Sequence, residues 1–228
     1  MAQLTWDSTG QRYFETGVDH GVLYPMKSDG TYDKGVAWNG LTAVNESPSG
    51  AEPNEKYADN MLYAVLRSAE KYEATIEAMT YPDEFGECDG TAEIAPGVNV
   101  GGQTRKAFGF AYRTKIGNDV AGMDKGYKLH LIYNATANPS EKNYETVNED
   151  PDTISFSWEI TSAPVPLEGY KPVSHIVIDS TKADATKLAT LEAKLYGSDG
   201  TAGTDPTDAT EPTLPTPDEV KTMMTSDA

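Results

Sequence analysis

The residues best suited to chemistry in this sequence are four carboxylates within seven positions, Asp83, Glu84, Glu87 and Asp89. Carboxylates this close together could share a calcium ion or act as a general acid and base in hydrolysis. The stretch lacks the ordered ligand spacing of a calcium-binding loop. We therefore interpret it as a solvated acidic loop. A carboxylate hydrolase is kept as an alternative, in which replacing Asp83 with Asn and Glu84 with Gln abolishes an activity.

The remaining candidates for catalysis or metal binding are few. His20, His130 and His175 stand in no metal-ligand spacing with one another or with a carboxylate. Cys88 is the single cysteine, which excludes an internal disulfide and a thiolate zinc site, and we expect it to be buried. Neither a phosphate loop, nor a nucleophile elbow, nor a dinucleotide fingerprint occurs. We therefore expect no metal, no cofactor and no enzymatic activity.

The charge of the chain is strongly acidic and unevenly distributed. The 228 residues carry a formal net charge of −18, and residues 46–93 alone contribute −9. Such a field repels nucleic-acid phosphates, so specific binding of DNA or RNA is not expected. No apolar run is long enough to span a bilayer, and the start of the sequence lacks a signal-peptide pattern. We expect no membrane association and synthesis in a cytoplasm.

The clearest structural signal is a long β-hairpin between residues 106 and 134. Phe108, Phe110 and Tyr112 alternate with small or polar residues, and a second alternating run extends from Tyr127 to Tyr133. Residues 116–126, between the two runs, are rich in turn formers and predict a sizeable exposed loop. These two strands should form the centre of the fold.

Further strands are predicted on both sides of this hairpin. One lies within residues 13–24, interrupted by glycines, and another within 35–45 with a turn or bulge at Asn39-Gly40. A strand at 72–79 has a polar face with Glu73 and Glu77, and a preceding strand at 61–67 would be joined to it by a turn at 68–71. The other predicted strands are 153–160 and 173–178, and long loops are expected at 46–60 and 82–103.

One confident helix is predicted, at residues 183–196. Ser180 or Thr181 would cap it, and Gly197 would end it. We expect residues 1–10 to form an N-terminal arm with Trp6 as an anchor, and 11–197 to form the β domain. Residues 198–216 would be a flexible acidic linker, and 217–228 a C-terminal arm with a short helix. The fold class is mainly β with one flanking helix.

Several contiguous runs resemble a known family. They are Gly35 to Pro53, Ala74 to Phe85 with Cys88-Asp-Gly90, Arg105 to Thr114, Gly126 to Tyr133, and the end Leu-Pro-Thr-Pro-Asp-Glu-Val220. These runs are similar to the major tail proteins, or tail tube proteins, of long, non-contractile-tailed bacteriophages and related prophages. The similarity covers residues 10–197 and the C-terminal end.

The resemblance implies a two-sheet sandwich or partly closed barrel with a flanking helix. It also implies assembly into hexameric rings that stack into a tube in the virion, a conduit through which DNA passes without specific binding. Implied partners are further copies of the chain, the tape measure protein, and the tail terminator and distal tail proteins. Synthesis would take place in the bacterial host cytoplasm. A monomeric surface- or carbohydrate-binding β-sandwich module is the alternative.

Within this hypothesis, residues fall into three groups of candidates. Glu73 and Glu77 would face the lumen. Contacts between rings or subunits would involve acidic residues of the long loops, namely Glu46, Glu52, Glu55, Asp83, Glu84, Glu87 and Asp89. The C-terminal arm would contribute Leu214, Val220 and Met223.

Overall fold

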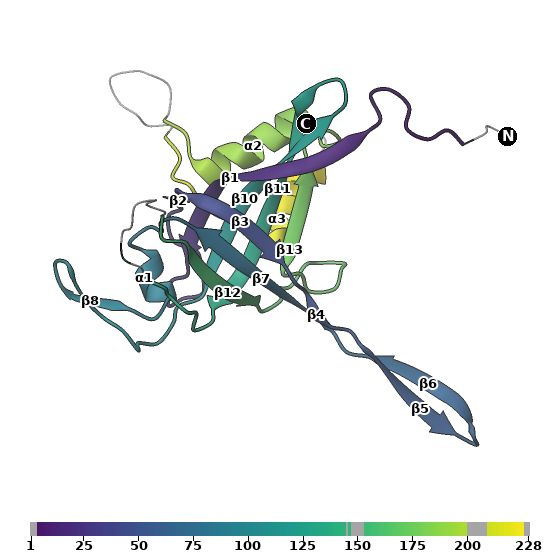
Figure 1. Ribbon diagram of the computed structural model, residues 1–228, viewed down its shortest axis with the longest axis horizontal. Coiled ribbons are helices and arrows are strands. Elements are labelled where there is room, and N and C mark those ends of the chain that lie inside the picture. Colours follow the sequence, from purple (N-terminus) through teal and green to yellow (C-terminus); the bar gives the residue numbers. More distant parts are fainter. Residues whose placement is uncertain (1–3, 145, 147–152, 200–208, 226–228) are drawn as a thin grey trace.

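The computed structural model describes residues 4–144, 146, 153–199 and 209–225. The chain is mainly β, with 48% of residues in strands and 12% in helices. Most strands belong to one antiparallel sheet, in the order β2-β1-β10-β11-β12-β7-β3, with β13 paired to β11 and β4 to β7 (Figure 1). Its strands are β1 (Tyr13–Pro25), β2 (Val36–Trp38), β3 (Leu41–Glu46), β4 (Ser49–Gly50), β7 (Glu70–Ala78), β10 (Phe108–Asn118), β11 (Gly122–Ala137), β12 (Phe156–Ser162) and β13 (His175–Asp179).

The predicted central hairpin is confirmed as β10 and β11, but the loop between them is much shorter than expected. The strands remain paired out to Asn118 and Gly122, and Ile116, expected in the loop, is buried. The side chain of Asn118 accepts hydrogen bonds from the backbone N–H groups of Val120 and Ala121. This side-chain bonding closes a tight turn, which lets both strands continue through the turn-forming residues.

Strand β11 is shared between two parts of the sheet. Its middle residues, from Lys128 to Ile132, pair with β13, and its last residues, from Ala135 to Ala137, pair with β12. The β12-β7-β3 part packs over one face of β1-β10-β11. The core between them contains an aromatic cluster, Trp38, Phe85, Phe108, Phe110 and Trp158.

The opposite face is covered by helices α2 (Ala185–Tyr196) and α3 (Pro217–Thr225). Helix α2 buries Leu188, Leu191 and Leu195, as its periodicity predicts. The predicted N-terminal caps are wrong, because the Asp184 side chain accepts the hydrogen bonds from the backbone N–H groups of Thr186 and Lys187 at the helix start. Ser180 instead accepts from the N–H of Tyr127, so its hydroxyl holds the β11–β13 junction.

The described residues before and within the last helix pack on the body of the chain rather than extending from it. Among the described residues of the expected linker, Thr213 donates its N–H to the Lys194 carbonyl, and Leu214 is buried in the core under α2. Helix α3 starts with the predicted capping box, in which Thr216 and Glu219 exchange hydrogen bonds. The burial of Leu214 offsets the conformational entropy lost by this ordered segment.

Two further hairpins and a short helix lie outside the main sheet. Strands β5 (Pro53–Ala58) and β6 (Met61–Arg67) form a hairpin that projects far from the body (Figure 1). Strands β8 (Ala92–Ala95) and β9 (Val98–Val100) form a second one, after the one-turn α1 (Phe85–Cys88). The expected loops at 46–60 and 82–103 are therefore partly strand and helix, and β6 pairs with β5 rather than with β7.

The N-terminal arm does not use the predicted anchor, because the Trp6 side chain is 77% exposed. The arm is instead held at Gly10, whose N–H donates to the Asp119 carboxylate in the β10–β11 turn. Strand β12 begins only at Phe156, which leaves Ile154 outside the strand and exposed. No helix in the described part of the chain is long and apolar enough to cross a membrane.

Candidate functional site

The most unusual surface of the chain is the β5–β6 hairpin. Strand β6 is apolar at every position from Met61 to Leu66, and all of these side chains except Ala64 are exposed. Because side chains alternate between the two faces of a strand, both faces of the hairpin carry apolar groups. Tyr57 on β5 adds a further exposed aromatic ring. The hairpin thus presents a two-sided apolar surface that no described part of the chain covers.

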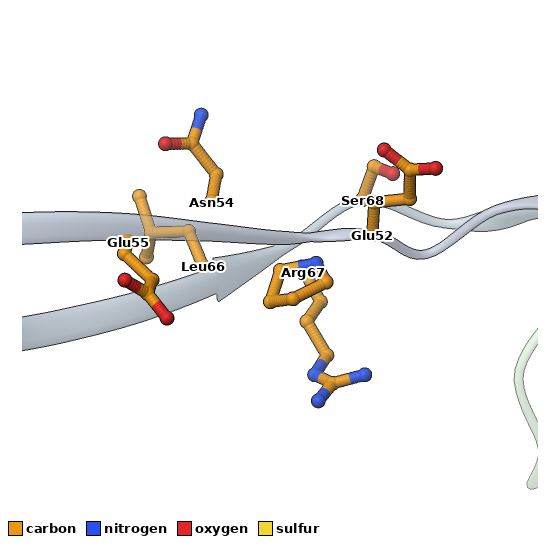
Figure 2. A pocket seen from close by; sticks show the side chains of 7 residues that line it. Glu52, Asn54, Glu55, Leu66, Arg67 and Ser68 are labelled. Carbon is orange, nitrogen blue, oxygen red and sulfur yellow. The ribbon is translucent and has the colours of Figure 1, made fainter.

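A hollow at the root of this hairpin is not built as a ligand pocket. It is lined by Glu52, Pro53, Asn54, Glu55, Leu66, Arg67 and Ser68. Figure 2 shows the side chains of Asn54 and Glu52 on one side of the strands and those of Glu55 and Arg67 on the other. In a ligand pocket, the polar groups that recognise the ligand point toward one shared space. The polar side chains around this hollow point away from one another, so it does not form such a pocket. The candidate contact residues Glu52 and Glu55 thus lie on the surface of the projecting hairpin.

The polar face predicted for β7 is confirmed. Tyr72, Ala74, Ile76 and Ala78 are buried, and the half-buried Glu73 and Glu77 alternate with them on the outer face. Glu159 on the neighbouring β12 lies opposite Thr75, on this same face. Among the described residues, none of these three glutamates forms an ion pair with a cation. The outer surface of the β12-β7-β3 part is therefore an acidic face, whose three glutamates have no ion-pair partner among the described residues.

The acidic stretch at 83–89 does not bring its carboxylates together. Asp89 is buried between Arg105 and Lys142, to both of which it is ion-paired. Glu87 pairs with Lys106 on the surface, and Asp83 and Glu84 are exposed. The expectation of a solvated loop is therefore wrong for Asp89, which joins the α1 region to two neighbouring segments. Nothing in this arrangement resembles a general acid and base pair.

Cys88 is buried, as expected. Its burial raises the pKa of the thiol to about 12, so the reactive thiolate is not formed near neutral pH.

The three-dimensional structure brings together one glutamate and two histidines whose proximity the sequence does not predict. Glu46 at the end of β3, His130 on β11 and His175 on β13 place one ligand atom each within 4.8 Å of the others. His130 Nδ1 lies 3.2 Å from His175 Nε2. Glu46 Oε1 lies 3.5 Å from His130 Nδ1 and 3.6 Å from His175 Nε2. In the described part of the chain, this is the only group of its kind.

The strand register explains the meeting of these side chains. His130 is paired with Val177, two residues after His175, so the two imidazoles lie on the same face of neighbouring strands. Tyr112 faces His130 across the β10–β11 pair, and their rings stack with centroids 4.5 Å apart. Glu46 was expected in a loop, but it lies where β3 ends against β7. The sequence signal was limited to two histidines in strands, with no indication that the strands are neighbours.

Hydrogen bonds and burial set the electrostatics of this cluster. The pKa of Glu46 is lowered to about 2, first by its bond with His130 and then by that of Tyr112, whose hydroxyl donates to Oε1 at 2.6 Å, although partial burial opposes the shift. Burial lowers the pKa of His175 to about 4. At neutral pH, Glu46 is therefore ionised and His175 is neutral.

The candidate residues of the C-terminal arm lie mostly in the core. Leu214 and Val220 are buried, and Met223 is half-buried against the same cluster. In this conformation their apolar groups are covered by α2 and the sheet, so they stabilise the fold of the chain.

No protein-family model matches the chain, and no curated protein matches it significantly.

Proposed function

We propose that this protein is a tail tube subunit of a long, non-contractile phage tail. In this proposal, copies of the chain assemble into hexameric rings, and the rings stack into a conduit for DNA. The observation that carries the proposal is the β5–β6 hairpin. An uninterrupted apolar run is typical of strands covered on both faces, and an isolated two-stranded hairpin is only marginally stable in water. The exposed run from Met61 to Leu66 therefore favours a hairpin that is completed by other subunits.

The ends of the main sheet support assembly through strand edges. Among the described strands, β3 is paired only with β7, and β2 is paired only with β1. A strand edge with unpaired N–H and C=O groups is a template for pairing with another chain. Two such edges on one subunit suit a ring in which each sheet continues into the next.

The acidic outer face of β12-β7-β3 supports the conduit role. Glu73, Glu77 and Glu159 would repel the phosphates of passing DNA, because like charges oppose adhesion. This face belongs to the same part of the sheet as the β3 edge, so extension through β3 would carry the acidic surface from subunit to subunit.

The resemblance supports the same assignment and its partners. The similar runs Gly35 to Pro53 and Ala74 to Phe85 contain β2, β3, β4 and the last five residues of β7. They therefore include both strand edges used above and, from the acidic face, Glu77. Further partners by resemblance are the tape measure, tail terminator and distal tail proteins, with the virion as the location.

Assembly of the purified chain tests the proposal. Light scattering after size exclusion and negative-stain microscopy, over a concentration series, should show rings or tubes. Tyr63→Ser should raise the concentration needed for assembly at least about tenfold, since burying such a ring contributes about 2 kcal/mol. Tyr170→Ser is the matched control, because the two tyrosines are 74% and 70% exposed.

Two outcomes would overturn the proposal. One is a wild-type chain that stays monomeric at high concentration even with isolated tail tips as initiators. The other is equal assembly of the Tyr63→Ser and wild-type chains. A monomer that binds oligosaccharides would instead indicate the carbohydrate-binding module.

A further inference from the structure

The geometry points to a binding site for a transition-metal ion, with Zn²⁺ as the best fit, formed by Glu46, His130 and His175. This inference does not depend on the proposed assembly into tubes. Three strands, β3, β11 and β13, each contribute one ligand. A bound ion would therefore cross-link the end of the β3–β7 pair to the β11–β13 pair.

The distances between the ligand atoms fit a tetrahedral ion. Zinc–nitrogen and zinc–oxygen bonds of 2.0–2.1 Å place neighbouring ligand atoms of a tetrahedron about 3.3 Å apart. The three separations are 3.2, 3.5 and 3.6 Å. The donor atoms thus stand close to the positions that an ion at their centre requires.

The donor set selects the class of ion. Two imidazoles and one carboxylate suit zinc and related divalent transition metals. Calcium and magnesium prefer sites built entirely from oxygen ligands, whereas two of the three ligands here are nitrogens.

The surroundings of the ligands have the features of a supported metal site. Nε2 of His130 lies 3.1 Å from Thr114 Oγ1, a contact that leaves Nδ1 free to point at the ion. The Tyr112 hydroxyl donates to Glu46 Oε1, and its ring stacks on His130. Both interactions fix the orientation of a ligand before any ion binds.

A buried hydroxyl beside the cluster supplies a second, independent observation. The Tyr72 ring packs on His175 with centroids 4.9 Å apart, and its buried hydroxyl, which lies beside Glu46 and Tyr112, makes no well-formed hydrogen bond within the described residues. Buried polar groups are rarely left unpaired. Three protein ligands leave one coordination position for water, and a water there would offer Tyr72 a partner. The Glu46 side chain remains 35% exposed, which gives an ion access from solvent.

The test is Zn²⁺ binding to the full chain, purified without a metal-affinity tag and treated with chelator. Calorimetric titration should give one ion per chain, and Co²⁺ should produce the visible absorption of a four-coordinate site. Glu46→Gln, which keeps an acceptor for Tyr112, should weaken Zn²⁺ binding at least about 100-fold. Thr114→Val should weaken it by about tenfold, because it removes only the support of His130.

His20→Gln is the matched control, because His20 lies outside the cluster and is exposed. It should bind Zn²⁺ as the wild type does. The inference is overturned if the wild type shows no saturable binding, if Glu46→Gln binds equally well, or if His20→Gln loses binding. Circular dichroism of every variant separates a lost site from a lost fold.

Discussion

The buried phenol of Tyr24 on β1 donates a hydrogen bond of 2.8 Å to the backbone carbonyl of Leu195 in the last turn of α2. Carbonyls in the last turn of a helix have no partner within the helix. This bond satisfies one of them and attaches α2 to the sheet.

We expect Tyr24→Phe to lower the free energy of unfolding by about 1–2 kcal/mol, because it leaves the Leu195 carbonyl buried and unpaired. Urea unfolding followed by circular dichroism measures the change. Tyr13→Phe is the control, since Tyr13 is exposed, and it should stay within about 0.5 kcal/mol of the wild type. Equal stability of the two variants would contradict the role given to Tyr24.

The buried ion pairs of Asp89 predict a large effect from a small change. Asp89→Asn would leave Arg105 and Lys142 without their carboxylate, and we expect a loss of about 3 kcal/mol in unfolding free energy. Glu87→Gln breaks the exposed pair with Lys106 and should cost less than about 1 kcal/mol. Chemical denaturation of both variants compares a buried ion pair with an exposed one in the same acidic stretch. Similar losses of unfolding free energy would show that burial does not determine how much an ion pair stabilises the fold.

Leu214 provides a test of the packing of the chain end. Leu214→Ala should destabilise the monomer by about 2–4 kcal/mol, because it opens a cavity beneath α2. Leu4→Ala, in the exposed N-terminal arm, should leave monomer stability unchanged. A larger change is the deletion of residues 214–228, which removes all three candidate contact residues of the C-terminal arm. Because Leu214 and Val220 are buried, we expect this deletion to unfold the chain, which thermal melting of the truncated protein would show.

The acidic face can be tested by reversing its charge. Tubes assembled from the Glu73→Lys, Glu77→Lys variant should form normally but retain DNA, and the retention should weaken as salt is raised. Phage carrying the variant should eject DNA more slowly. Glu141→Lys with Glu168→Lys makes the same change in net charge at exposed positions elsewhere and should not retain DNA. If both double variants hold DNA equally, the face of β7 has no special position in the tube.

Sequence periodicity located most strands, but not their partners. Alternating residues in 108–112 and 127–133 identified the central pair, because one face of each strand is buried and the other is not. The run from Met61 to Leu66 was placed in a strand next to β7, since adjacent strands usually pair. The structure pairs it with β5, because Asp59 and Asn60 adopt positive φ angles in the tight turn that joins the two strands.

The amino-acid sequence by itself determined the β-rich class, the polar face of β7, the leucine face of α2 and its glycine stop. These features depend on neighbours along the chain. Only the tertiary structure decided that Glu46, His130 and His175 share one site, that Asp89 is buried among cations, and that Leu214 belongs to the core. Each of these depends on strands or segments that are distant in sequence and become neighbours through long-range pairing, which local periodicity does not encode.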